Sequence, residues 1–78
     1  MTVLKDGFEF VWNDDFFIET KITDNSLTIK ANKSGLLSLA RHIQSLAQDE
    51  VPNHYHFHLD ESNAFEDGSA EIIIEKII

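Results

Sequence analysis

The sequence predicts one α+β domain over residues 1–78, in which an antiparallel sheet of four to five strands packs one face against one amphipathic helix, in the order β-β-β-α-β-β. Two patterns predict this architecture. Several short segments alternate apolar and polar residues, as half-buried strands do, whereas one segment repeats apolar residues with the period of a helix. A chain of 78 residues has a small core, so we do not expect a deep catalytic cleft.

The first half of the chain is predicted to form consecutive antiparallel strands. Apolar residues alternate in residues 8–12, in residues 16–23 and again in residues 27–31. Turn-forming residues separate these segments, namely Asp6-Gly7, Asn13-Asp14-Asp15 and Asp24-Asn25-Ser26. The first of these turns is predicted to close a short hairpin with residues 2–4.

A helix is predicted from about residue 35 to residue 48, with Ser34 as its N-cap, ending before Val51-Pro52 because proline favours an extended predecessor. Its apolar stripe should face the sheet and consists of Leu36, Leu39, Ala40, Ile43, Leu46 and Ala47. The residues expected to face water are Arg41, Gln44, Ser45 and Gln48, and His42 is interpreted as a polar helix residue.

Two more strands are predicted after the helix. Residues 54–59 alternate, with Tyr55, Phe57 and Leu59 directed inward and three histidines outward. A polar loop over residues 60–69, anchored by Ala64-Phe65, leads to a last strand over residues 70–78 that is apolar on both faces. The sheet face away from the helix would carry Val11, Phe17, Ile73 and Ile77, and we expect a partner or a second copy to cover it.

Acidic residues dominate the charge of the chain, which is −8, and most of them lie in its second half. Such a charge repels phosphate backbones and anionic lipid headgroups, so nucleic-acid and membrane binding are not expected. No Lys or Arg occurs between His42 and Glu75. The acidic residues of that stretch are Asp49, Glu50, Asp60, Glu61, Glu66, Asp67, Glu71 and Glu75.

The cellular location expected from the sequence is the cytoplasm. No basic segment followed by an apolar one begins the chain, and no run of apolar residues is long enough to cross a membrane. The chain also has no cysteine, which excludes disulfides and thiolate metal sites and fits a reducing compartment.

The histidine row His54, His56 and His58 is the most unusual local pattern. Alternate strand residues lie about 6.6 Å apart on one face, so two of the imidazoles could share a metal ion. If the last strand pairs beside them, Glu71 and Glu75 fall on the same side, either as oxygen ligands or as cross-strand partners. A catalytic zinc needs three fixed ligands and a general base in a pocket, so no metal or cofactor is predicted.

Catalysis has little support in the sequence. It contains no G-x-S-x-G motif, no cysteine nucleophile and no glycine-rich phosphate loop, and adjacent acids on loops occur by chance. We therefore predict no catalytic residues and expect a protein that is not an enzyme.

The second half resembles a known family. The ordered combination consists of Gly35-Leu36-Leu37-Ser38-Leu39-Ala40-Arg41-His42, Leu46-Ala47-Gln48, Val51-Pro52, His56-Phe57-His58-Leu59-Asp60 and residues 65–76. This pattern is similar to the immunity protein 32 family of bacterial polymorphic toxin systems and covers residues 27–77, about two thirds of the chain. Phe65 stands where a leucine is expected.

The resemblance implies a small cytoplasmic antidote that binds and blocks a cognate toxin domain. Many such toxins attack nucleic acid and present a basic groove, so the charge predicts an acidic contact with a basic toxin domain, for which a nuclease is the candidate. The predicted contact residues are Asp49, Glu50, Asp60, Glu61, Glu66, Asp67, Glu71, His54, His56 and His58. Two alternatives remain: a homodimeric structural or regulatory domain joined through the uncovered sheet face, and a small metal-binding module that uses His56, His58 and a glutamate.

Overall fold

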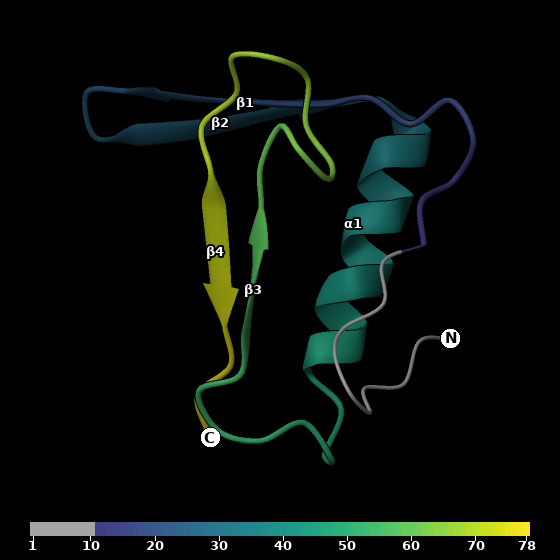
Figure 1. Ribbon diagram of the computed structural model, residues 1–78, viewed down its shortest axis with the longest axis vertical. Coiled ribbons are helices and arrows are strands. Elements are labelled where there is room, and N and C mark those ends of the chain that lie inside the picture. Colours follow the sequence, from purple (N-terminus) through teal and green to yellow (C-terminus); the bar gives the residue numbers. More distant parts are fainter. Residues whose placement is uncertain (1–10) are drawn as a thin grey trace.

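The computed structural model describes residues 11–78 and has an α+β architecture, as predicted (Figure 1). Its elements, in order, are β1 (Ile18–Thr23), β2 (Ser26–Ala31), α1 (Lys33–Leu46), β3 (His56–Leu59) and β4 (Ile72–Glu75). The hairpin predicted for residues 2–4 and most of the strand predicted for residues 8–12 lie outside the described residues. Val11 and Trp12, which end that segment, are not in a strand.

The strands form two separate sheets, so the prediction of a single four- to five-stranded sheet is wrong. β1 pairs with β2 and β3 pairs with β4, both antiparallel. The chain before β4 runs along the free side of β1, where Glu66 N–H donates to Ile18 O (2.9 Å) and Ala70 N–H donates to Thr20 O (3.3 Å). It then turns away, so β4 itself never pairs with β1, and the β1–β2 hairpin crosses one end of the β3–β4 sheet (Figure 1).

The β1–β2 hairpin has a two-residue turn, Asp24-Asn25, and Asp24 adopts the left-handed conformation with φ 55° that such turns require. One face of the hairpin carries three cross-strand pairs, which are Ile18 with Ala31, Thr20 with Ile29, and Ile22 with Leu27. The base of this face joins the core, because Ile18 and Thr20 are buried. The tip does not, and Ile22 and Leu27 are 61% and 49% exposed.

Asn32, and not the predicted Ser34, caps the N-terminus of α1. Its side-chain Oδ1 accepts hydrogen bonds from the N–H of Gly35 (2.8 Å) and of Phe17 (3.0 Å), and its Nδ2 donates to Asp15 O (2.7 Å). The amide therefore satisfies an unpaired helix N–H and also fixes the chain that enters β1. Ser34 lies inside the first turn of α1, after the capping position, and so is not its N-cap.

The buried face of α1 is rotated from the predicted one. The prediction that Ser45 faces water is wrong, because Ser45 is buried together with Ser38 and His42, whereas Leu36 and Ile43 of the predicted stripe are exposed. The cause is the segment before β1, which packs on the polar flank of the helix. The N–H of Asn13 donates to Ser38 Oγ (2.8 Å), and the ring of Trp12 meets His42 edge-on at 4.6 Å.

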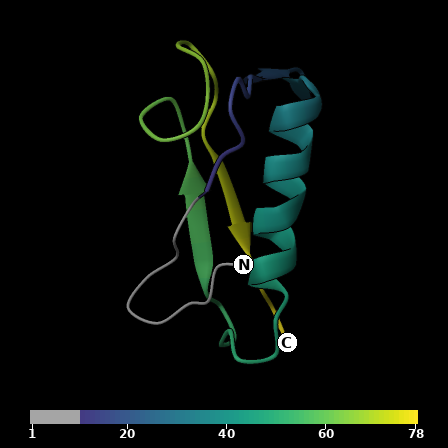
Figure 2. The same ribbon diagram turned by 90° about the vertical axis from the view of Figure 1, so that its right-hand side faces the viewer.

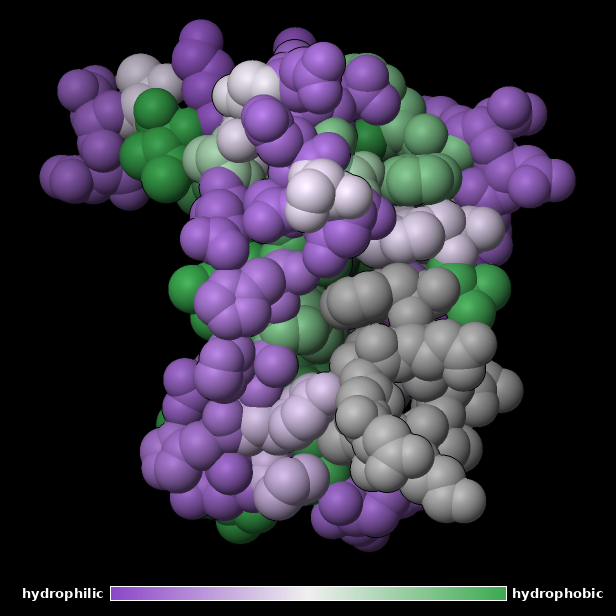
Figure 3. All heavy atoms as spheres, in the orientation of Figure 1, coloured by the Kyte–Doolittle hydropathy of each residue, from purple (hydrophilic) through white to green (hydrophobic). Residues whose placement is uncertain are grey.

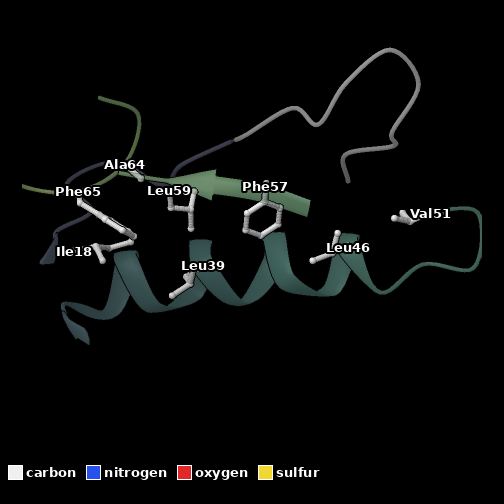
Figure 4. Close-up of a cluster of buried hydrophobic side chains, with 8 residues drawn as sticks. All are labelled: Ile18, Leu39, Leu46, Val51, Phe57, Leu59, Ala64 and Phe65. Atoms are coloured by element: carbon white, nitrogen blue, oxygen red, sulfur yellow. The ribbon is translucent and has the colours of Figure 1, made fainter. Parts of the chain in front are cut away.

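The core lies between α1 and the β3–β4 sheet. Phe57 and Leu59 point from β3 toward the helix, as their alternation predicts, and Ala64-Phe65 anchors the following loop (Figure 4). The buried apolar residues are Ile18, Leu39, Leu46, Val51, Phe57, Leu59, Ala64 and Phe65. Within residues 11–78, no helix has the length and apolar character needed to cross a membrane.

The residues predicted to form a second, uncovered sheet face do not share a face. Phe17 precedes β1, whereas Ile73 lies on β4, so the two sheets separate them. Val11 and Ile77 lie outside both sheets. A homodimer through that combined face is therefore not available, because the predicted face depended on one continuous sheet.

Candidate functional site

Three histidines and two glutamates share the face of the β3–β4 sheet that points away from α1. In the register, His56 lies opposite Glu75 and His58 lies opposite Ile73. The imidazole Nδ1 of His54 is 2.7 Å from Glu75 Oε2, and that of His58 is 3.0 Å from Glu71 Oε2. The expected placement of Glu71 and Glu75 on the histidine side is thus confirmed, and we call these five residues the histidine face.

The histidine face does not assemble a metal centre. The rings of His56 and His58 meet edge-on with centroids 5.1 Å apart, while Glu71 and Glu75 are engaged by different imidazoles. In residues 11–78, no group of three or more His, Asp or Glu side chains is arranged to hold a metal ion. The arrangement forms cross-strand polar pairs instead.

The loop over residues 60–69 is ordered by its own acidic side chains. Asp60 Oδ1 accepts from the hydroxyl (2.6 Å) and from the N–H (2.9 Å) of Ser62, and these two bonds lower the pKa of the Asp60 carboxyl. The N–H of Asp60 donates to Asn63 Oδ1 (2.9 Å), and the buried Ala64 and Phe65 hold the loop on the core. The first part of the loop therefore has a fixed shape.

The second part of the loop is closed by Glu61, whose Oε2 accepts from the N–H of Gly68 (2.9 Å). Gly68 has φ 86°, a conformation that favours glycine, and no neighbouring atom would obstruct a side chain there. Between these residues, Glu66 and Asp67 are exposed. The backbone of Glu66 is bonded to Ile18 O, so its carboxylate projects from a fixed point.

Asp49 and Glu50 lie at the other end of the β3–β4 sheet from the 60–69 loop, in the connection between α1 and β3 (Figures 1 and 2). α1 ends at Leu46, so this doublet lies beyond the last helical turn. The ammonium group of Lys76 donates to the carbonyls of Gln48 (2.6 Å) and Val51 (2.8 Å) on either side of the doublet. The structure thus separates the predicted contact residues into two acidic groups joined by the histidine face.

The acidic groups are not neutralised by basic side chains of the described residues. Among residues 11–78, a lysine is paired with a carboxylate at Lys30 and Glu19 (3.8 Å) on the β1–β2 hairpin, and the other carboxylate contacts of this kind are those of His54 with Glu75 and of His58 with Glu71. Lys76 is engaged by backbone carbonyls. Hydrophilic residues cover the front of the molecule where Figure 1 draws β4 and the 60–69 loop (Figure 3).

His42 has a structural role that its sequence context did not indicate. It is fully buried beside Trp12, and burial, together with the neighbouring charge of Arg41, lowers the pKa of its imidazole against a smaller opposing effect of a hydrogen bond with the Val11 backbone. A pattern in the sequence could have revealed this buried position. Ser38, His42 and Ser45 are spaced so that these three small or polar residues lie on one face of the helix.

Comparison with known proteins gives one result. The family model for immunity protein 32 matches residues 26–77, which is two thirds of the chain. The chain belongs to the immunity protein 32 family. This match confirms the resemblance and implies the role of an immunity protein. Comparison with curated proteins and with solved structures gives no match.

Proposed function

We propose that this immunity protein neutralises a cognate toxin domain in the cytoplasm by binding it through the 60–69 loop and the adjoining histidine face. The observation that carries the proposal is the group of exposed carboxylates of Glu61, Glu66 and Asp67, none of which forms an ion pair with a basic side chain of the described residues. Glu71, which directly precedes β4, continues this group toward the histidine face through its contact with His58 on β3.

The order of the loop supports its use as a contact surface. Binding loses less entropy when the contacting side chains are already held in place. Asp60 and Glu61 bond to the loop backbone, and Phe65 fixes the loop to the core, so little ordering remains for the binding step. This combination of internal hydrogen bonds and a buried anchor distinguishes the loop from an acidic surface that serves solubility alone.

The charge indicates the chemistry of the partner. A surface without Lys or Arg attracts a basic groove, such as the substrate groove of a nuclease, and competes with the polyanionic substrate for it. Complementary fields raise association rates to about 10⁸ M⁻¹s⁻¹ or more at low salt, against about 10⁵ to 10⁶ for a neutral pair. We therefore propose a basic toxin domain, and a toxin that acts on nucleic acid.

Equal charge reversals at three places test this proposal. The cognate toxin domain is expressed with wild-type protein or with one of three double variants: Glu66→Lys/Asp67→Lys on the loop, Asp49→Lys/Glu50→Lys at the other end of the sheet, or Asp14→Lys/Asp15→Lys before β1. Each changes the net charge equally. We expect the loop variant to raise the Kd for the toxin by about tenfold or more and to lose protection of the cells.

The Asp14 and Asp15 variant is the matched control, and it should protect as well as the wild type. The Asp49 and Glu50 variant shows whether the contact extends along the histidine face to the far end. A loop variant that binds and protects as well as the control variant would show that the 60–69 loop is not the contact surface.

A further inference from the structure

The outer edge of β2 carries backbone groups that no other described residue uses. β1 lies on one side of β2, and within residues 11–78 no strand or loop pairs with the other side. Every residue from Ser26 to Lys30 is exposed. A regular six-residue strand with a free edge is a template for another strand, and such edges are usually blocked in monomeric proteins.

The pairing of β1 identifies the β2 residues whose backbone faces this edge. Ile18 and Thr20 direct their carbonyl groups away from β2, toward Glu66 and Ala70. Residues that lie directly opposite each other in an antiparallel pair either bond to one another or both face outward. Ala31 and Ile29, which lie opposite Ile18 and Thr20, therefore face the free edge, as does Leu27 by the same alternation.

The β1–β2 hairpin also differs from the rest of the molecule in charge. It holds Glu19 and Asp24 against Lys21 and Lys30, so its net charge is zero in a chain of net charge −8. Its exposed face is apolar at the tip. A second copy of this acidic chain would be repelled by the 60–69 loop but not by this hairpin. Pairing through β4 would instead bring Glu75 and the neighbouring Glu71 close to the same carboxylates of the second copy.

We propose that a second copy of this chain pairs antiparallel with β2, so that two hairpins form one four-stranded sheet around a two-fold axis. The outward-facing residues Leu27, Ile29 and Ala31 must then oppose one another, which places the apolar faces of both hairpins on the same side. In the registers that pair Ile29 with Leu27 or with Ile29 of the second copy, Lys30 lies opposite Ser26 or Thr28. No lysine opposes a lysine.

The same two-fold arrangement covers Leu27, the residue of the apolar tip that lies on β2, and leaves Ile22 on β1 outside the contact. Antiparallel pairing brings the turn of each hairpin next to the start of α1 in the other copy, where Leu36 is 53% exposed. Either register brings Asp24 in the turn of one copy toward the start of α1 in the other, where Lys33 lies, because β2 ends two residues before Lys33. The free edge, the exposed Leu27 and this pair of opposite charges thus fit a second copy of the same chain.

Sedimentation equilibrium of the full-length protein over a range of concentrations tests the proposal. We expect the average mass to rise toward twice the 8.9 kDa monomer mass, and the association to strengthen with salt, because salt screens the repulsion between acidic bodies. Toxin binding through the 60–69 loop should instead weaken with salt. The opposite salt dependences allow the dimer and the toxin contact to be confirmed or contradicted independently.

Two pairs of variants locate the contact. Ile29→Lys should abolish the dimer, whereas Ile22→Lys, which adds the same charge on the same face but on β1, should leave it largely intact. Asp24→Lys should weaken the dimer, and Asp24→Lys combined with Lys33→Glu should restore it. Circular dichroism of each variant confirms that the monomer is folded.

Three results would overturn the proposal. The first is a wild-type protein that stays monomeric at all concentrations and salt levels. The second is a dimer that Ile29→Lys and Ile22→Lys weaken equally. The third is a monomeric protein in which Ile29→Lys reduces toxin binding, which would assign the β2 edge to a strand of the toxin.

Discussion

The two sheets of this molecule are held in different ways. The β3–β4 sheet is fixed by apolar contacts, because Phe57 and Leu59 pack on α1 and their strand exposes polar residues on the other face. The β1–β2 hairpin is fixed at its base, by the buried Ile18 and by polar contacts from Asn32 and from the segment before β4. Its tip extends beyond the core (Figure 1).

This difference separates two kinds of surface. A sheet held by burial of one face can carry charge on the other without loss of stability, and the β3–β4 sheet carries the histidine face there. A hairpin held at its base can leave a neutral, apolar tip and a free edge. The first surface fits a partner of opposite charge, and the second fits a partner of like charge that meets it through neutral residues.

Truncating one leucine in each sheet should show the largest difference between the two sheets, measured as the loss in the free energy of unfolding. Leu59→Ala removes a fully buried side chain and should lower the free energy of unfolding by about 2 to 5 kcal/mol. Leu27→Ala removes an exposed side chain at the hairpin tip and should change it by less than about 0.5 kcal/mol. Urea denaturation of dilute protein, below any self-association, measures both. Equal losses in the free energy of unfolding for the two variants would contradict the conclusion that the two sheets are held in different ways.

The polar attachment of the hairpin can be tested at Asn32. Asn32→Ala removes the helix cap and the bonds to Phe17 and Asp15, so we expect the free energy of unfolding to fall by about 2 kcal/mol. Ser34→Ala, at the position that the sequence pattern predicts as the cap, should change it by less than about 0.5 kcal/mol. The same denaturation experiment compares the two variants. A larger loss at Ser34 would reverse the assignment of the cap.

A pH experiment probes the polar flank of α1 and should show the smallest effect, because it concerns one ionisable group. The pKa of buried His42 is lowered from its usual value of 6.5, so the unfolded chain binds the proton more tightly. Stability from this group is present above about pH 6.5 and is lost as the pH falls toward the folded-state pKa. His42→Phe should flatten the fall in urea midpoint between pH 7 and pH 5.

The exposed histidines remain in this variant, so the difference between the two proteins isolates His42. Where the variant does not fold, titration of the His42 ring by NMR in the wild-type protein gives the same answer. A His42 imidazole that titrates above 6.5 would contradict the lowered pKa and the loss of stability at acid pH that follows from it.

Local patterns in the sequence predicted much of the local structure. Alternation placed β1, β2 and β3, and it correctly directed Phe57 and Leu59 inward. It also placed Glu71 and Glu75 beside the histidines, because the period of a strand determines which residues share a face once two strands pair. The family resemblance came from ordered motifs of the second half and was confirmed by the family match.

The features that the sequence did not predict depend on contacts between distant segments. The rotation of α1 arises because Trp12 and Asn13 pack on its polar flank, and the helical period gives no information about such a segment. The division into two sheets depends on how the chain after Ala70 turns away from β1. The separation of Asp49 from the 60–69 loop follows from the orientation of β3, which joins the two acidic groups end to end.

Association kinetics with the cognate toxin domain test the proposed contact most directly. The association rate of the wild-type protein is measured over a range of ionic strengths beside the Glu66→Lys/Asp67→Lys and Asp14→Lys/Asp15→Lys variants. We expect the wild-type and Asp14 variant rates to fall steeply with salt, and the loop variant to associate about tenfold or more slowly at low salt with a weaker salt dependence. Equal rates and equal salt dependence for both variants would contradict an acidic contact at the 60–69 loop.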